Sequence, residues 1–247
     1  MIILQVIYLI IVISLAIGVI AGIVEAICKN DSLHHPYGLY ERFAKRGLDA
    51  FLATGAIIVL TPILFIISIL VCAKLGFPIL FTQDRPGRNG KIFKLYKFRT
   101  MLPPNEGQSG PESDAQRLTS FGKKLRATSL DELPELINII KGDMAVVGPR
   151  PLLVQYLSRY NAYQARRHEV RPGFTGLAQV HGRNAISWEE KLNWDVKYVD
   201  HITFKGDVKI ILNTLRTVLK REGISNGDSV TMTEFMGSDY SAEVQKK

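Results

Sequence analysis

The chain has few cysteines, only Cys28 and Cys72 among 247 residues, and each lies at the end of an apolar stretch. Two isolated thiols exclude a disulfide framework and lack the spacing of a thiolate metal site, so the composition is compatible with a reducing compartment. Acidic residues are also scarce, with 23 Asp and Glu against 31 Lys and Arg, and the net charge is +8. This excess of positive charge favours an anionic partner: a nucleic acid, an anionic lipid or a phosphorylated substrate.

Residues 1–27 contain almost no polar side chains, with Gln5 and Glu25 as the strongly polar interruptions. About 24 helical residues reach ~36 Å, which is enough to cross a hydrocarbon core of ~30 Å. The alternative of a cleaved signal peptide fits poorly, because no basic segment precedes the stretch and no small-residue cleavage site ends it. We expect a retained transmembrane helix. Basic residues begin after it, at Lys29, so its C-terminal end should face the cytoplasm.

A second apolar stretch, residues 48–75, is also long enough to span a bilayer and carries Thr61 and Pro62 at its middle. Proline removes a backbone donor, so a sharp break is expected there, and the Thr61 hydroxyl can bind a carbonyl that the break frees. Basic residues lie on both flanks: Lys45 and Arg46 before the stretch, and Lys74, Arg85, Arg88, Lys91, Lys94, Lys97 and Arg99 after it. Positive charge on both sides favours a re-entrant helix whose two ends stay in the cytoplasm. A plain second span with a kinked helix remains the alternative.

The linker between the two apolar stretches, residues 28–47, has an interfacial pattern. Tyr37, Tyr40 and Phe43 precede the basic pair that opens the second stretch. Aromatic rings followed by basic side chains are typical of a short helix lying at the lipid headgroups.

The remaining chain predicts one soluble domain and a tail. Residues 76–221 indicate a compact α/β domain, mostly helical, with a strand at residues 91–98 that mixes apolar and basic side chains. Residues 206–221 predict a basic amphipathic helix, which can pack on the domain or lie on an anionic membrane. Residues 222–247 are polar and without periodicity, so we expect a disordered tail.

Residues 129–140 carry the strongest local signal. Their apolar side chains recur at the spacing of one helix face, and these are Leu133, Leu136, Ile137 and Ile140. Pro134 is tolerated only in the first turn of such a helix, where backbone N–H groups have no intrahelical partner. The pattern therefore predicts an amphipathic helix with an acidic pair at or beside its N-terminus.

That acidic pair, Asp131 and Glu132, has two interpretations. Ser129 with Glu132 matches a capping box, and acidic residues are common at helix starts. The same helix end can instead bind phosphate through its N–H groups, provided that a metal or basic residues offset the two carboxylates. Arg126 and Arg150 are candidates for that role, and Mg²⁺ is the natural bridge between carboxylate and phosphate oxygens. Spacing alone leaves both interpretations open.

Two arginine-containing turns follow. Arg150 has proline on both sides, which restricts its backbone and can aim the guanidinium at an anion, although a solvated arginine in a rigid turn is equally compatible. Residues 171–183 hold three glycines and two arginines, a weak signal for phosphate binding. His181 and the two tryptophans, Trp188 and Trp194, are expected to be structural.

An ordered set of short motifs resembles the bacterial sugar transferase family, the monotopic phosphoglycosyl transferases that start polysaccharide and glycan assembly. The motifs are Lys45-Arg46-Gly47-Leu48-Asp49, Thr61-Pro62, Arg99-Thr100-Met101, Ser129-Leu130-Asp131-Glu132-Leu133-Pro134, Gly142-Asp143-Met144, Val147-Gly148-Pro149-Arg150-Pro151 and Arg171-Pro172-Gly173-Phe174-Thr175-Gly176. The family usually has Ser-Pro at the helix break, where this chain has Thr-Pro and keeps a hydroxyl. Residues 1–27 lie outside the family's minimal catalytic unit.

The resemblance implies an activity. Asp131 would attack a UDP-sugar, expel UMP and carry the phosphosugar until undecaprenyl phosphate, a polyprenyl phosphate, accepts it. Glu132 would help to hold Mg²⁺ with Asp131 or manage a proton. Phosphate contacts are expected from Arg126, Arg150, Lys45, Arg46, Arg99 and Arg171.

The resemblance also implies a place in the cell: a bacterial inner membrane, with the catalytic domain on the cytoplasmic face and the lipid bilayer, rather than a nucleic acid, as partner. Two rival interpretations are a polytopic single-displacement transferase, which needs more spans, and a non-catalytic membrane or nucleic-acid-binding module. The sugar cannot be read from the sequence.

Overall fold

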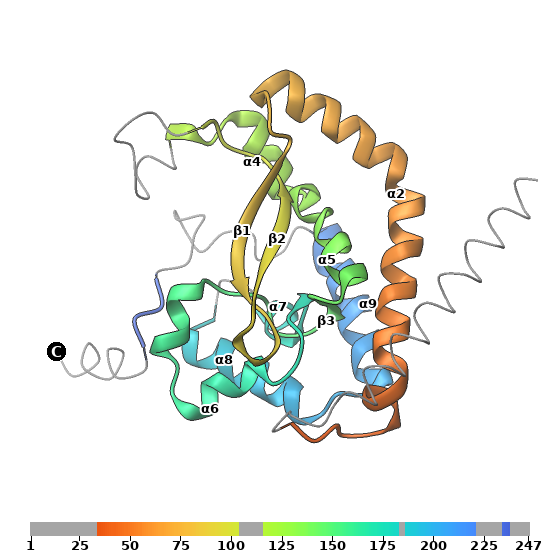
Figure 1. Ribbon diagram of the computed structural model, residues 1–247, viewed down its shortest axis with the longest axis vertical. Helices are drawn as coiled ribbons and strands as arrows, with labels where there is room; N and C mark the ends of the chain where they lie inside the picture. Colours follow the sequence, from red (N-terminus) through yellow and green to blue (C-terminus); the bar gives the residue numbers. More distant parts are fainter. Residues whose placement is uncertain (1–33, 104–115, 183–185, 221–233, 238–247) are drawn as a thin grey trace, which may run out of the picture.

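The computed structural model describes residues 34–103, 116–182, 186–220 and 234–237. The predicted transmembrane helix at residues 1–27 lies outside this part of the chain. In the part that the structure describes, one long bent helix runs along a mostly helical domain with two small sheets (Figure 1). The α/β, mostly helical class predicted from the sequence is confirmed.

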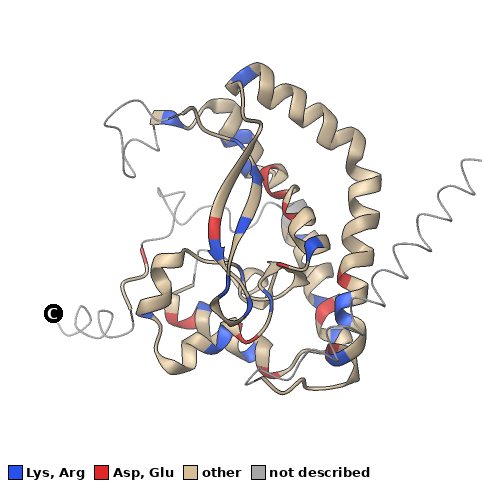
Figure 2. Ribbon diagram, viewed as in Figure 1, with Lys and Arg blue, Asp and Glu red and all other residues tan. Residues whose placement is uncertain are grey.

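The long helix is α2, Lys45–Leu75, and a π-helical turn, η1 (Tyr40–Ala44), leads into it. Within the described residues, Tyr40–Leu75 is the one helix long and apolar enough to cross a membrane. Figure 2 shows charged residues at its two ends and none along its middle. Val59 is 75% exposed and Phe65 65% exposed, so the helix presents apolar side chains that the protein does not cover.

Pro62 lies inside α2, and Figure 1 shows the helix bending midway along its length. The helix is continuous across the proline, so the predicted sharp break is in fact a bend. The Thr61 hydroxyl donates to the carbonyl of Ile57 at 2.7 Å. The carbonyl that lacks its helical donor belongs to Ile58, four residues before the proline. Thr61 therefore supports the helix one residue away from the position expected.

Both ends of α2 are fastened to the same domain. At the N-terminal end, Arg46 donates to the carbonyls of Ile139 and Ile140, at 2.8 Å each, which end the helix α5 (Glu135–Lys141). At the C-terminal end, Arg99 donates to the carbonyls of Leu75, Gly76 and Phe77. Apolar contacts near that end add Ile67, Val71 and Leu75 to a core with Phe98 and Leu125. The bend brings both ends back to one body.

The two sheets each have two strands. β1 (Leu80–Pro86) pairs antiparallel with β2 (Ile92–Phe98) across the short turn η2 (Arg88–Gly90), which confirms the strand expected at residues 91–98. β3 (Ala145–Val147) pairs parallel with β4 (Gly173–Thr175). A Cβ on Gly173 would lie 2.0 Å from the backbone nitrogen of Gly148, so this second pair of strands requires glycine at its close approach.

The expected helix at residues 129–140 is divided. A 3-10 turn, η3 (Leu130–Glu132), follows helix α4 (Ser120–Ala127), and Pro134 then caps α5. Leu136 and Ile139 are buried, but Ile137 and Ile140 are exposed, so the predicted apolar face is only partly correct. The reason is that Pro134 starts a new helix, which presents a different face to α2 and β2.

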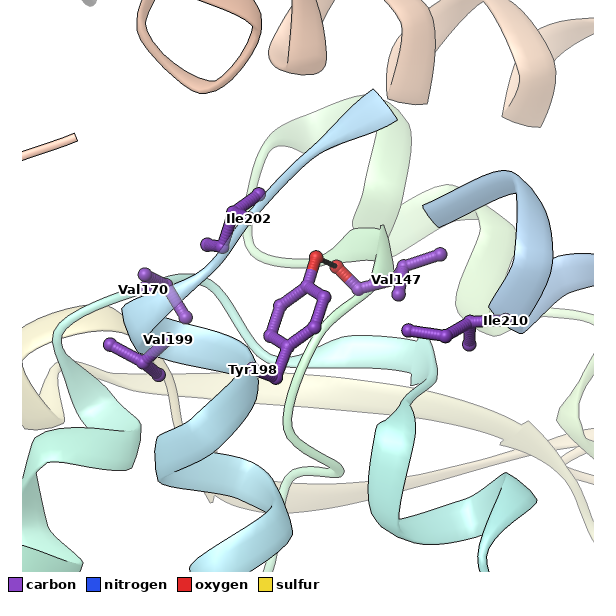
Figure 3. Packing of buried hydrophobic residues seen from close by; sticks show 6 residues of the cluster. All are labelled: Val147, Val170, Tyr198, Val199, Ile202 and Ile210. Atoms are coloured by element: carbon purple, nitrogen blue, oxygen red, sulfur yellow. Dashed lines mark hydrogen bonds between the residues drawn. The ribbon is translucent and has the colours of Figure 1, made fainter. Parts of the chain in front are cut away.

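The C-terminal half closes the fold. Its shorter elements are η4 (Val154–Arg159), α6 (Ala162–Ala165), η5 (Arg166–His168) and α7 (Leu177–Val180). The longer helices are α8 (Trp188–Asp200) and α9 (Phe204–Lys220). Figure 3 shows the core beneath them, where the Tyr198 hydroxyl lies 2.9 Å from the Val147 carbonyl oxygen. The same hydroxyl lies 2.9 Å from Asp207, which also pairs with Lys45 at 2.7 Å and so joins α9 to α2.

Two further expectations concern the C-terminal part. On α9, Leu212 is 60% exposed and Leu215 is also exposed, so much of the predicted apolar face is free of the domain. Phe235, within the tail expected to be disordered, is buried in the domain. Residues 234–237 therefore have a defined position against the domain, and the expectation of disorder for the tail as a whole stays a prediction.

Candidate active site

The acidic pair stands on the turn η3, between α4 and α5. Ser129, which precedes it, has a left-handed backbone with φ of 54° and makes no side-chain hydrogen bond as a cap. The capping-box interpretation is therefore wrong for this pair. The left-handed residue turns the chain sharply, so that Asp131 and Glu132 are placed against β2 rather than at the start of a long helix.

The two carboxylates have opposite electrostatic environments. Burial raises the pKa of Asp131, the charge of Glu132 raises it further, and Lys97 and Arg126 oppose both effects. Burial would also raise the pKa of Glu132, but Arg150 and Lys97 hold it well below its ordinary value. Asp131 is only 7% exposed. The pair thus combines a firmly ionised, cation-bound Glu132 with a more basic Asp131, an arrangement typical of catalytic carboxylates.

Glu132 is held by two cations. Lys97 Nζ lies 2.7 Å from its Oε1, and the Arg150 guanidinium donates to both of its oxygens. Lys97 also lies 3.1 Å from Glu135, a buried acid whose pKa is raised to about 6, mainly by burial. Sequence reasoning assigned site roles to neither Lys97 nor Glu135. Lys97 lies on β2, 35 residues before Glu132, and no spacing rule relates a hairpin residue to a distant turn.

A cavity of about 260 Å³ opens beside this pair. One side is formed by Arg126, Glu132 and Arg150. The other walls come from β4 and helices α7, α8 and α9, and include Phe174, Thr175, Gln179, Lys191, Thr214 and Thr217. Asp131 adjoins the wall through Glu132 without lining the cavity itself. The volume and the basic wall suit a phosphorylated ligand of moderate size.

Rigid supports hold the arginines of the cavity. Arg126 Nε donates to Thr100 Oγ1 at 3.1 Å. The carbonyl of Arg150 accepts from Arg167 at 2.6 Å, and Arg167 is itself buried in an ion pair with Asp195 at 2.8 Å. A buried, hydrogen-bonded ion pair beneath Arg150 fixes the direction of its backbone.

The other basic residues predicted for phosphate do not gather at the carboxylate pair. Lys45, Arg46 and Arg171 line a second, small cavity at the start of α2. Arg171 donates to the carbonyl of Gly142 at 2.7 Å, beside the carbonyls that Arg46 binds. Arg99 contacts the other end of α2. Lys45, Arg46 and Arg99 stabilise the placement of α2, whereas Arg171 binds the turn that ends α5, and the phosphate roles of all four stay predictions. His181 stacks on Trp194 with ring centroids 4.0 Å apart, as expected for a structural residue.

The donors present fit Mg²⁺ bound together with a substrate. Among the described residues, no three His, Cys, Asp or Glu side chains converge as a preformed metal cluster. Mg²⁺, however, is commonly held by one or two carboxylates with phosphate oxygens and water completing its shell. Asp131 can offer a carboxylate in that way, and Glu132 stands next to it although Lys97 and Arg150 already bind its oxygens.

Comparison with known proteins gives a consistent result. The model of the family described as bacterial sugar transferase matches residues 40–221. The uncharacterized sugar transferase EpsL of Bacillus subtilis is 52% identical over 176 residues, covering 71% of this chain and 87% of EpsL.

Two other relatives are longer proteins. The galactosyl transferase CpsE of Streptococcus agalactiae is 42% identical over 196 residues, 73% of this chain and 43% of CpsE. The undecaprenyl-phosphate galactose phosphotransferase of Salmonella typhimurium is 35% identical over 199 residues, 74% of this chain and 42% of that protein. This chain therefore spans less than half the length of these two relatives. The extent of the family match, with the motifs now seen on one folded body, shows that the chain belongs to the bacterial sugar transferase family.

Proposed function

We propose that this protein transfers a sugar phosphate from a UDP-sugar to undecaprenyl phosphate, releasing UMP and forming a polyprenyl-diphosphate-sugar. The observation that carries the proposal is the acidic pair with opposite pKa directions, set beside a cavity with an arginine wall. A relative named as an undecaprenyl-phosphate galactose phosphotransferase supports the acceptor, and one named as a UDP-galactose-lipid carrier transferase supports the donor.

In the first step, an Asp131 oxygen attacks the phosphorus that carries the sugar. The bond from that phosphorus to the bridging oxygen breaks, and UMP leaves with the electron pair. The product is a phosphosugar joined to the carboxylate as an acyl phosphate. Asp131 suits the role because its raised pKa makes the carboxylate the more basic of the pair. Arg126 and Arg150 would bind the phosphate oxygens along their side of the cavity.

In the second step, a phosphate oxygen of undecaprenyl phosphate attacks the same phosphorus, and the Asp131 carboxylate leaves unchanged. Two displacements separate the two anionic substrates, which would repel each other in a direct reaction. Glu132, kept ionised by Lys97 and Arg150, orients those cations and does not compete as nucleophile. Mg²⁺, when bound, would supply positive charge for the diphosphate.

The attachment of α2 supports a re-entrant arrangement in the membrane. Its N-terminal end is bonded to α5 through Arg46, and its C-terminal end is bonded to Arg99 after β2. With both ends attached to one folded domain, a re-entrant path keeps both ends of the helix on the same side of the bilayer as that domain. The exposed apolar side chains along its middle would lie in lipid, and Leu212 and Leu215 of α9 would lie at the same surface. We place the domain on the cytoplasmic face, because basic residues flank α2 on both sides.

Single-cysteine labelling tests this topology. In a background without Cys28 and Cys72, the exposed positions Leu39 and Lys91 are changed to cysteine one at a time. A membrane-impermeant thiol reagent should label neither site in intact cells and both sites once the membrane is opened. With Pro62→Ala added, straightening of α2 should let some molecules span and expose the Lys91 site. Labelling of that site from outside in the protein with Pro62 intact would establish a true second span.

The pH dependence of the first step should reveal Lys191 in the cavity wall. Burial lowers its pKa to about 8, with Arg150 and Arg167 acting in the same direction and Asp195 opposing them. Lysine is positive below its pKa, so kcat/KM for UDP-sugar should fall about tenfold as the pH rises above 8 and the charge is lost. Lys191→Arg should remove the fall, because arginine stays charged. The same fall in the Arg variant would assign the dependence to another group.

The substrate experiment is a panel of UDP-sugars with undecaprenyl phosphate in nanodiscs, measured as UMP release and as lipid product. One sugar should give both products in equal amounts. A non-catalytic membrane or nucleic-acid-binding module would give neither product with any sugar, and that result would end the proposal.

A further inference from the structure

Residues 234–237 bind to the domain, with one side chain buried in an apolar pocket. The Phe235 side chain is only 2% exposed and is surrounded by Tyr156, Tyr160 and Trp188. Its ring centroid lies 5.7 Å, 5.5 Å and 5.4 Å from theirs, respectively, and it is stacked on Tyr160. Leu192, at the floor of the same cluster, is fully buried. A polar segment has thus placed one aromatic side chain in an apolar pocket built by η4 and α8.

Polar contacts fix the backbone and direction of this segment. Glu234 accepts from Gln155 at 2.7 Å and from Arg159 at 2.8 Å. Arg159 also donates to the carbonyl of Phe235 at 2.5 Å. Met236 is 50% exposed and contributes little to the apolar pocket. The recognition elements are those of a short peptide ligand: an acidic side chain held by a cation, followed by an aromatic anchor.

The pocket that holds Phe235 adjoins one wall of the cavity beside the acidic pair. Trp188, which packs on Phe235, has Lys191 Nζ 4.8 Å from its ring centroid, and Lys191 lines the cavity. Leu152 packs on the Phe235 cluster and also lines the cavity. Without Phe235, the rings of Tyr156 and Trp188 would lose their common packing partner. Phe235 therefore contacts the aromatic ring on which Lys191 lies.

We propose that residues 234–237 are a tethered peptide ligand of the catalytic domain, and that docking of Phe235 against Trp188 positions Lys191 in the wall of the cavity. Thirteen residues of the sequence, 221–233, join α9 to this segment. A tether of that length keeps the ligand at an effective concentration on the order of millimolar, so a modest intrinsic affinity suffices. The expected effect on substrate binding rests on the proposed function, because it assumes that the cavity binds a UDP-sugar. The docking of Phe235 does not depend on that function.

The test compares Phe235→Ala with the matched control Met236→Ala in the full chain. Loss of the buried ring should weaken docking by at least about 100-fold. The KM for UDP-sugar should rise roughly fivefold in Phe235→Ala, with kcat within about twofold of the parent, because wall contacts rather than the acidic pair are changed. Met236→Ala and the conservative Phe235→Leu should stay close to the parent.

A synthetic peptide with the sequence of residues 229–241 separates docking from general damage. At millimolar concentration it should restore the KM of Phe235→Ala, and the same peptide with Phe235 replaced by Ala should not. Trp188 fluorescence, measured in a Trp194→Phe background, should shift with Phe235→Ala and return with peptide even if no sugar nucleotide is turned over. An unchanged Trp188 signal in Phe235→Ala would overturn the docking. A shifted signal with an unchanged KM would overturn the link to the cavity.

Discussion

Asp131→Asn is expected to lower kcat by at least about 10⁴-fold, because an amide cannot form the acyl phosphate that links the two half-reactions. The substitution changes neither the shape nor the size of the side chain. The carboxylate it removes is buried, does not cap a helix and lies next to a second carboxylate. The loss of activity should therefore come from the chemistry and not from unfolding.

The stability of this variant provides an internal check. Burial and Glu132 raise the pKa of Asp131 in the folded protein, so the folded state binds that proton more tightly than the unfolded chain does. The ionised carboxylate consequently disfavours folding at pH values above its folded pKa, and the effect disappears below the unfolded pKa. Asn carries no charge, so the thermal midpoint at neutral pH should equal or exceed that of the parent.

The matched control is Asp84→Asn. Asp84 is exposed on β1 and pairs with Lys94 at 3.5 Å, so its loss should leave kcat within about twofold and stability nearly unchanged. An Asp131→Asn variant that turns over at the rate of this control, with deamidation to Asp excluded by mass spectrometry, would rule out Asp131 as nucleophile.

Arg150→Ala should lower kcat/KM by about 10²- to 10³-fold. Arg150 binds both oxygens of Glu132, and its charge acts on Asp131 as well. Its removal leaves Glu132 with Lys97 as its strong partner, raises the pKa of Glu132 and takes one cation from the cavity wall. The proposed diphosphate would lose a bidentate partner at the same time.

Arg150→Lys should recover only part of the activity, because an ammonium keeps the charge but not the planar pair of donors. Arg166→Ala is the matched control: Arg166 pairs with Glu169 and Asp200 and does not line the cavity. Steady-state UMP release measures all three variants. Activity of Arg150→Ala within about threefold of Arg166→Ala would remove Arg150 from the site.

The sequence predicted those features that depend on local pattern. The uncharged run between Asp49 and Lys74 predicted the long apolar helix, and Pro62 predicted its bend. Ser187 and Glu190 form a capping box at the start of α8, a contact between residues three apart in the chain. Arg150 does contact Glu132, as the interpretation of Arg150 as a partner of the acidic pair expected, and the catalytic roles of these residues stay predictions.

Features that depend on contacts between distant segments could not be read in the same way. Ser129 and Glu132 match a capping box by spacing, but a left-handed backbone at Ser129, set by the packing of η3 on β2, prevents it. In the sequence, Arg46 and Arg99 look no different from arginines that bind phosphate. In the fold, Arg46 at the start of α2 and Arg99 at its end both donate to backbone carbonyls. Phe235 lies in a polar tail whose composition predicts disorder, and its pocket comes from residues between Leu152 and Leu192, 43 to 83 positions earlier.

The most direct measurement of the central claim is intact-protein mass spectrometry of the enzyme mixed with its UDP-sugar and no lipid acceptor. The account predicts one equivalent of UMP released per enzyme and a mass increase equal to one phosphosugar, which tandem spectra place on Asp131. Addition of undecaprenyl phosphate should remove the adduct and yield the lipid product. UMP release that strictly requires undecaprenyl phosphate, with no adduct trapped on Asp131, would contradict the account and establish direct displacement.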